Sequence, residues 1–346
     1  MRRATTAVGA LVLSLAACSP GTPSGPEVLT IIAHDSFAGG VSNETFASFT
    51  AQTGVEVRVL QGGDAGLVVN QAILTKDNPV ADVLFGVDDT FLSRALTAGI
   101  FVPYRSPLLE TVPAELQLDP EHRVTPIDFG DVCLNYDKAA MAAAGIEPPS
   151  SLDDLLDPAY LGLLAVQNPG TSSPGLAFLL ATIDRFGEPG WQEFWRGLVA
   201  NDVNVAGDWD AAYYGAFTRY GGDRPIVVSY ASSPPAEVIF AEEPLDEAPT
   251  GVVLDGCYRQ VEFAGILAGT EHQEAAERLV DFMLSQEFQE GIPLTWFVFP
   301  ANSEATLPPE FVEHTSIAPD PAGVDPEAID ANRERWIEEW NRIVLP

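Results

Sequence analysis

A run of hydroxyl side chains lies where a helix is expected to begin. The segment 168–175 (NPGTSSPG) contains Thr171 and Ser172, followed by Pro174, and proline is favoured in the first turn of a helix. Hydroxyls and free backbone N–H groups at a helix N-terminus can bind an anion or another polar group. Helix capping alone also explains the pattern. Thr171 and Ser172 are therefore candidate ligand contacts, with capping as the alternative.

Aromatic side chains gather at the ends of three other segments. They occur in WDAAYY at 209–214, at Tyr230 after an apolar run, and in the stiff apolar loop PLTWFVFP at 293–300. Aromatic rings of this kind either fill a core or form the wall of a binding site. The sequence leaves both explanations open for each of them.

The short motifs of common enzymes are missing from the sequence. It contains no GxSxG, no HExxH, no Walker A motif and no GxGxxG after a strand. The four histidines are scattered without metal-ligand spacing: His34, His122, His272 and His314. We therefore predict no catalytic residue, no cofactor and no metal site.

The charge balance excludes several kinds of partner. The 346 residues include 17 Lys and Arg against 50 Asp and Glu, a formal net charge of −33. Nucleic-acid binding needs clustered basic residues, and Lys76 and Lys138 are the only lysines. The same deficit disfavours electrostatic docking on anionic lipid. Compact cores stop growing near roughly 250–300 residues, so the length favours two lobes.

The N-terminus has the features of a bacterial lipoprotein signal. Arg2 and Arg3 precede an apolar stretch that runs into LAAC, ending at Cys18. We expect residues 1–17 to be removed, Cys18 to be lipidated, and residues 18–27, rich in Pro, Gly and Ser, to form a flexible tether. An ordinary secretory signal is the alternative. The mature chain would carry a net charge of −35 on the extracytoplasmic face of the cell membrane.

Two cysteines remain after the lipidation site. Cys133 and Cys257 would lie in an oxidising compartment, where an even number of cysteines favours a disulfide. Two buried free thiols are the alternative.

The remaining pattern predicts an α/β fold with mostly parallel sheets. Apolar or alternating runs predict strands at 28–33, 55–60, 81–87, 132–136, 163–166, 226–230 and 261–267. Helical spacing, caps and stop signals predict helices from Ser42 to Gly54, at 91–98, from Pro174, at 274–288 and after Asp325.

Several short stretches, taken in order, resemble one family. They include HDSF at 34–37, ADV at 81–83, DFG at 128–130, TSSPGL at 171–176, VSY at 228–230, QVE at 260–262 and WIEEW at 336–340. Together they resemble the thiamine-binding component of bacterial ABC importers, a type II periplasmic binding protein, over nearly the whole chain after the tether.

The resemblance implies a two-lobed protein with a ligand cleft between the lobes. Lobe one would comprise 28–127 plus 258–310, and lobe two 128–257. The segment 311–346 would hold an amphipathic helix that packs back onto the body. Cys133 and Cys257 would lie near the crossovers between the lobes, and the protein is expected to be a monomer.

The resemblance also implies the ligand site. Aromatic faces and a carboxylate would hold a thiazolium cation, and Thr171 and Ser172 would receive phosphate or hydroxyethyl oxygens. Four positions depart from the family: His34 and Ala236 replace tyrosines, Ala65 replaces a glycine, and Phe297 replaces a tryptophan. The full implied set is His34, Asp35, Asp64, Ala65, Thr171, Ser172, Trp209, Tyr213, Tyr230, Trp296 and Phe297.

The expected function is capture of thiamine or a thiamine-like compound, such as a thiamine phosphate or an aminopyrimidine, and its delivery to an ABC permease. The departures favour a relative of thiamine. A ferric-iron-binding importer protein, using the pair Tyr213 and Tyr214, is one alternative. A thiamine-degrading enzyme with Cys133 as nucleophile is another.

Overall fold

The computed structural model describes residues 27–42 and 44–345. The predicted signal at 1–17, the lipidation site Cys18 and nearly all of the tether lie outside the described residues. Within them, no helix is both long and apolar enough to span a membrane.

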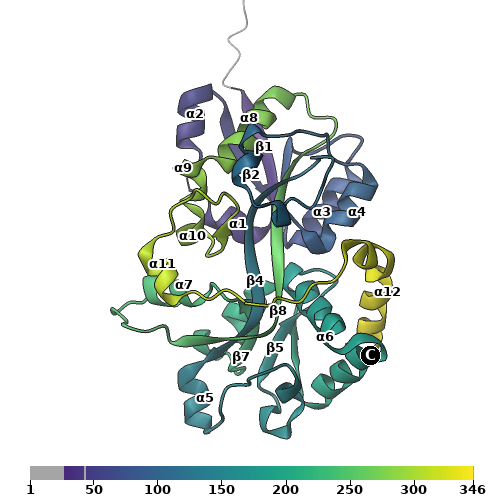
Figure 1. Cartoon of the computed structure of the whole chain (residues 1–346), viewed down its shortest axis with the longest axis vertical. Helices are drawn as coiled ribbons and strands as arrows, with labels where there is room; N and C mark the ends of the chain where they lie inside the picture. Colours follow the sequence, from purple (N-terminus) through teal and green to yellow (C-terminus); the bar gives the residue numbers. More distant parts are fainter. Residues whose placement is uncertain (1–26, 43, 346) are drawn as a thin grey trace, which may run out of the picture.

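Two lobes lie one above the other, and one continuous sheet runs through both (Figure 1). Its order is β2-β1-β3-β8-β4-β7-β5-β6, with β9 paired to β4. The strands are β1 Val28–Ala33, β2 Glu56–Gln61, β3 Val83–Asp88, β4 Thr125–Asp137, β5 Leu164–Gln167, β6 Asn204–Ala206, β7 Ile226–Tyr230, β8 Thr250–Ile266 and β9 Phe299–Pro300.

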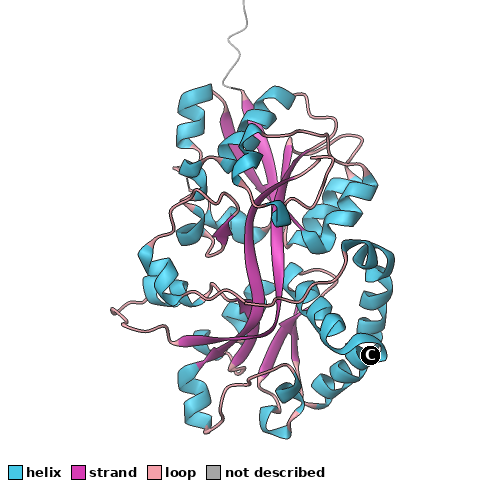
Figure 2. Cartoon of the chain, viewed as in Figure 1, coloured by secondary structure: helices cyan, strands magenta, loops and turns pink. Residues whose placement is uncertain are grey.

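Each lobe has a small parallel group of strands. β1 pairs in parallel with β2 and β3 in the upper lobe, and β5 pairs in parallel with β6 and β7 in the lower lobe. The antiparallel strands β4 and β8 run through both groups and join them (Figure 2). The sequence predicted only short pieces of these two strands, 132–136 and 261–267, so the antiparallel centre is a finding of the structure.

Helices cover both sides of the sheet in each lobe (Figure 2). The α-helices are α1 Asp35–Gly40, α2 Ala47–Thr53, α3 Ala65–Leu74, α4 Asp89–Ala98, α5 Lys138–Ala144, α6 Ser173–Ala200, α7 Pro234–Ile239, α8 Gln273–Leu284, α9 Gln286–Gln289, α10 Ile292–Thr295, α11 Pro309–His314 and α12 Pro326–Val344. Short helical turns add η1 Pro107–Thr111, η2 Ala114–Leu116, η3 Asp153–Leu156, η4 Pro158–Tyr160, η5 Ala211–Ala216 and η6 Thr218–Tyr220.

Local capping explains where several helices begin and end. α2 and α4 stop at Gly54 and Gly99, which adopt the left-handed conformation that glycine tolerates best. The single helix predicted at 274–288 is wrong. It breaks at Ser285, whose extended backbone ends α8 and whose hydroxyl accepts a hydrogen bond from the Phe288 N–H to begin α9.

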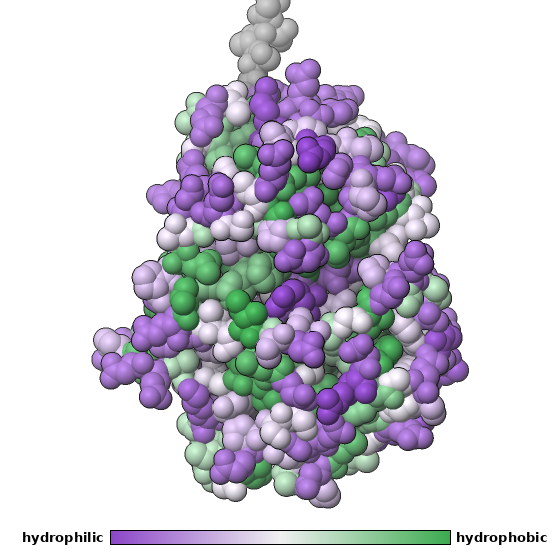
Figure 3. Space-filling model, in the orientation of Figure 1, coloured by the Kyte–Doolittle hydropathy of each residue, from purple (hydrophilic) through white to green (hydrophobic). Residues whose placement is uncertain are grey.

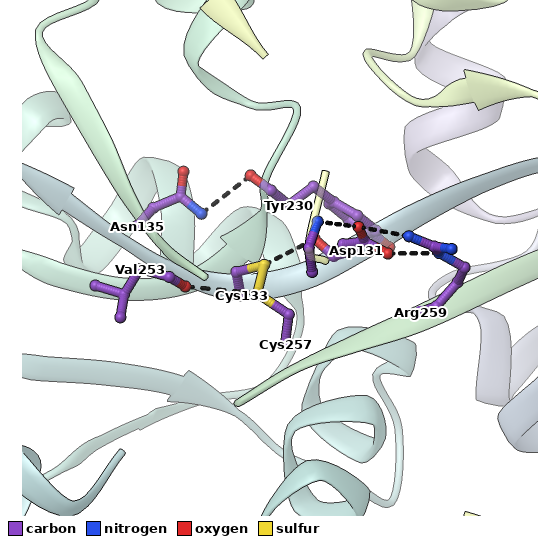
Figure 4. The surroundings of a disulfide bond; sticks show 8 residues. Asp131, Cys133, Asn135, Tyr230, Val253, Cys257 and Arg259 are labelled. Atoms are coloured by element: carbon purple, nitrogen blue, oxygen red, sulfur yellow. Dashed lines mark hydrogen bonds and ion pairs between the residues drawn. A yellow bond between two sulfur atoms is a disulfide. The ribbon is translucent and has the colours of Figure 1, made fainter. Parts of the chain in front are cut away.

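The two cysteines form a disulfide, as predicted. Cys133 on β4 and Cys257 on β8 are bonded, and both are buried. Figure 4 shows the bond beside a second connection between the same strands, in which the Arg259 guanidinium donates to both carboxylate oxygens of Asp131, at 2.8 and 3.0 Å. The disulfide sits where the β4–β8 register shifts between Val132 and Leu134. It therefore fixes an irregular part of the central strand pair.

The C-terminal helix α12 packs on α4 of the upper lobe and on α6 of the lower lobe. Its Arg333 guanidinium lies 4.2 Å from the centre of the Phe91 ring of α4, and its Trp340 ring meets Trp195 of α6 edge to face at 5.3 Å. The helix thus contacts both lobes through buried side chains.

Candidate functional site

A cavity of about 570 Å³ lies between the lobes and is lined by residues of both. Its lining includes most of the residues that the resemblance implied. Thr171 and Ser172 are not among them, and their neighbours Ser173 and Pro174 take that position. The implied residues that line the cavity are His34, Asp35, Asp64, Ala65, Trp209, Tyr213, Tyr230, Trp296 and Phe297, together with Ala236.

Acidic side chains dominate the charge of the cavity. Five carboxylates line it: Asp35, Asp64, Asp128, Asp210 and Glu262. Among the described residues that line it there is no lysine and no arginine. Partly enclosed walls carrying one sign of charge focus the electrostatic field on what enters. The cavity is therefore suited to a cation.

A rigid aromatic wall forms the upper side. The Phe37 ring stacks on Trp296 with centroids 4.7 Å apart and planes at 11°, and it also packs on Phe85 at 4.1 Å. The Trp296 indole N–H donates to the Phe37 carbonyl at 3.1 Å. This bond fixes the indole, which the chain supplies from just after α10.

A second aromatic wall comes from the lower lobe. Trp209 stacks on Tyr213 at 4.8 Å and 14°, and its indole N–H donates to the Ser229 hydroxyl at 3.0 Å. Tyr214 meets Tyr213 edge to face at 5.5 Å. Flat rings held in this way present fixed π faces to a ligand, and such faces attract cations and aromatic rings.

Tyr230 completes the lower side near the central strands. Its hydroxyl donates to Gln260 at 3.2 Å, and the Gln260 amide donates to Glu262 at 3.1 Å. Burial, reinforced by the charges of Glu262 and Asp88, raises the Tyr230 pKa well above its ordinary value. The phenol therefore stays neutral and can act as a hydrogen-bonding wall.

Asp64 is positioned at the start of α3. One carboxylate oxygen accepts from the Ala65 N–H at 2.8 Å, whereas the buried Oδ2 has no hydrogen-bond partner. The buried Ser172 hydroxyl also has none. Burial raises the Asp64 pKa, against the opposing effects of the Ala65 N–H and the His34 charge. A ligand that is positively charged or donates a hydrogen bond would satisfy the free oxygen.

Phe297 has a strained backbone at the rim of the cavity. Its φ of 56° lies in the left-handed region, which bulky residues rarely adopt. The Ser232 hydroxyl donates to its carbonyl at 2.6 Å, and its ring meets Phe240 at 5.6 Å. Strain of this kind concentrates at ligand sites.

Gly86 makes room for His34. It lies in the bulge between Phe85 and Val87, with φ of +87°. A Cβ atom at this position would overlap the imidazole ring. The bulge therefore lets the His34 ring approach the backbone of β3 at Gly86.

The geometry does not support the two alternatives predicted from the sequence. The Tyr213 hydroxyl donates to buried Glu237 at 2.8 Å, and burial followed by the Glu237 charge raises its pKa well above the ordinary value. Tyr213 is thus a poor source of a tyrosinate ligand for ferric iron. Cys133 is bonded to Cys257 and has no thiol with which to attack a substrate.

Comparison with known proteins shows the family to which the chain belongs. The model of a family described as bacterial extracellular solute-binding protein matches residues 78–321. The chain belongs to this family. This solute-binding protein is 31% identical, over 322 residues, to the thiamine-binding periplasmic protein of Escherichia coli K12, covering 92% of this chain and 93% of the relative.

The solved structures agree with the fold. A periplasmic thiamin binding protein superposes with a TM-score of 0.80 at 28% identity, covering 92% of this chain and 96% of the other. Iron uptake protein A1 of Synechocystis is more distant, at 25% identity over 318 residues, with 88% of this chain and 85% of the relative covered. The solute-binding protein thus has the two-lobed type II periplasmic binding protein fold.

Sequence analysis missed three of the five cavity carboxylates. Asp128 and Glu262 are opposite each other on β4 and β8, and Asp210 follows Trp209. Asp128 and Glu262 were part of the stretches that carry the resemblance, but they were given no role. The available signal was a carboxylate inside an otherwise apolar strand, because such groups are rarely buried without a purpose.

Proposed function

We propose that the protein captures thiamine or a thiamine-like compound outside the cytoplasmic membrane and delivers it to an ABC permease. The observation that carries this proposal is the cavity itself, which combines five carboxylates and two aromatic walls with no lysine or arginine in its described lining. A thiazolium ring carries a permanent positive charge and a flat π system. Each good cation–π contact contributes about 0.5–2 kcal/mol.

The relatives support the same ligand class. Relatives that match about nine-tenths of the chain, at 28–31% identity, are named for thiamine binding. Their names describe their own ligands. For this chain, the proposal of a cationic ligand rests on the acidic charge of its cavity.

The cavity is expected to bind thiamine, with its free hydroxyethyl group, more tightly than thiamine phosphates. A phosphate group is best held by arginine, lysine or several N–H donors, whereas Asp64 and Asp210 would repel it. We therefore expect thiamine to bind more tightly than thiamine monophosphate, with an aminopyrimidine weaker than both because it lacks the thiazolium charge.

Titration calorimetry tests the proposal with protein that begins after Cys18. Thiamine is expected to give saturable binding, and a neutral thiazole with the same substituents should bind at least about tenfold more weakly, which corresponds to about 1.4 kcal/mol. Absence of heat with thiamine, its phosphates and an aminopyrimidine would refute the ligand assignment. Mass spectrometry of ligand released from denatured protein is an independent check.

We infer that the protein is held at the membrane by lipid on Cys18, after removal of residues 1–17. Acyl chains on this cysteine would keep the receptor near its permease. Cys18→Ser is expected to release the protein into the soluble fraction, with the fold unchanged. Retention of the Cys18→Ser protein in the membrane fraction would contradict the anchor.

We also propose that the lobes are 28–127 plus 258–310 and 128–257, with 311–346 as the C-terminal segment. These boundaries fall a few residues before β4 begins to pair with β7, at Val132, and before β8 begins to pair with β3, at Glu262. Ligand-dependent changes in hydrogen exchange should concentrate at these boundaries and at the cavity lining. An even distribution over both lobes would count against the boundaries.

A further inference from the structure

His34 makes two hydrogen bonds that fix which ring nitrogen carries the proton. The Phe37 backbone N–H donates to Nδ1 at 3.3 Å, at the start of α1. Since an N–H can only donate, Nδ1 must be unprotonated. The proton of the neutral ring is then on Nε2, which faces the Glu262 carboxylate at 3.3 Å.

Acidic groups face this imidazole from several elements. Glu262 lies on β8, Asp64 begins α3, and Asp88 ends β3; Asp128 on β4 is the strand partner of Glu262. Burial lowers the His34 pKa, but the charge and hydrogen bond of Glu262, followed by the charges of Asp64 and Asp88, outweigh it, so the pKa is raised from its ordinary value. The surrounding carboxylates therefore favour the protonated imidazolium form of His34.

We propose that His34 sets the charge that the cavity presents to its ligand. As a neutral ring it holds Glu262 in place and leaves the carboxylate charge available to a cationic ligand. As an imidazolium it neutralises Glu262 and gives up the Nδ1 lone pair that receives the Phe37 N–H at the start of α1. This inference rests on the proposed binding of a cationic ring and adds its regulation by pH.

The consequence is competition between the protonated His34 ring and the cationic ligand for the Glu262 carboxylate. The apparent dissociation constant for the cation should rise by up to about tenfold for each pH unit below the His34 pKa. Burial, followed by the charge of Glu262, raises the pKa of Asp128 well above its ordinary value, and burial also raises the pKa values of Asp64 and Asp88. These groups take up protons as the pH falls, so they weaken cation binding in the same direction. A control variant is needed to separate their effect from that of His34.

Two substitutions provide that control. His34→Asn keeps an oxygen that can accept the Phe37 N–H, because asparagine is a good helix cap. His34→Gln keeps an amide donor that can reach toward Glu262. Neither side chain titrates, so both variants retain the carboxylate contribution to the pH dependence and remove that of the imidazole.

The experiment measures thiamine affinity by calorimetry from about pH 8 to about pH 5.5, a range that spans ordinary histidine titration. In the wild type, affinity should fall at least about fivefold more than in His34→Asn and His34→Gln, which corresponds to about 1 kcal/mol. A neutral thiazole should show little of this difference. Equal pH slopes in all three proteins would overturn the proposal.

A ligand-free measurement separates this inference from the proposed function. In a nuclear magnetic resonance titration, the Phe37 amide signal should move with the His34 imidazole, and it should stay fixed in His34→Asn. If Phe37 responds but thiamine binds at no pH, the proposed ligand is wrong and the switch stands. If thiamine binds and the Phe37 amide does not respond, the switch is wrong.

Discussion

Reduction of the Cys133–Cys257 bond should lower the free energy of unfolding by as much as about 5 kcal/mol. The two cysteines are 124 residues apart, so the bond closes a long loop in the unfolded chain. The loop-entropy relation gives about 5 kcal/mol at 25 °C for a loop of this length. Both residues are buried on neighbouring central strands, so the folded protein keeps the two sulfur atoms close after reduction.

The assay is urea unfolding followed by tryptophan fluorescence, with and without a reductant, on protein that begins after Cys18. With a denaturant slope of about 3 kcal/mol/M, the expected loss moves the midpoint down by as much as about 1.7 M urea. Alkylation and mass spectrometry would verify complete reduction. The double variant Cys133→Ala/Cys257→Ala is the control, because its midpoint should not respond to the reductant.

A fully reduced wild type whose midpoint moves by less than about 0.3 M, or about 1 kcal/mol, would refute this reasoning. It would mean that the unfolded chain already keeps the β4 and β8 segments together, so that the bond removes little entropy.

Three further outcomes follow from the structure. Gly86→Ala should reduce thiamine affinity at least about tenfold in calorimetry, with unchanged circular dichroism, because the new Cβ displaces His34; unchanged affinity would contradict it. Trp209→Ala should weaken thiamine binding about 3- to 30-fold and Trp209→Phe less, because phenylalanine keeps a π face; equal losses would count against a cation–π contact. Burial is the main cause that raises the pKa of Asp88 to about 6 and of Asp89 to about 7. The folded protein therefore holds these protons to a higher pH than the unfolded chain, and the melting temperature should fall as the pH rises from about 4 to about 7. Asp89→Asn should flatten this dependence, and an unchanged slope would show that other groups cause it.

The sequence was most informative where one physical signal dominated. Apolar runs at 28–33 and 81–87 predicted β1 and β3, and Gly54 predicted the end of α2. The long strands β4 and β8 were underestimated because polar residues such as Asp128 and Glu262 interrupt their apolar pattern. Those interruptions occur where the strands border the cavity, so the local pattern fails for a functional reason.

The candidate site could be predicted only in part. Aromatic residues and Asp64 followed from the resemblance, since they lie in recognisable stretches. The convergence of Asp128, Asp210 and Glu262 depends on strand pairing and on how η5 packs against β5, β6 and β7, and neither is encoded locally. Thr171 and Ser172 do not line the cavity, whereas their neighbours Ser173 and Pro174 do, and the Thr171 hydroxyl donates to the Gly207 carbonyl at 2.8 Å.

Helix α12 provides a second connection between the lobes, in addition to the strand pair β4 and β8. β4 and β8 join the lobes at the centre, and α12 joins them again to one side of these strands through Phe91 of α4 and Trp195 of α6 (Figure 1). On the face shown in Figure 3, the margin of the molecule where α12 lies is mainly hydrophilic. Two rigid bodies held at two separate places can turn only about the line through both places. While the α12 contacts hold, the lobes therefore share a single axis of rotation.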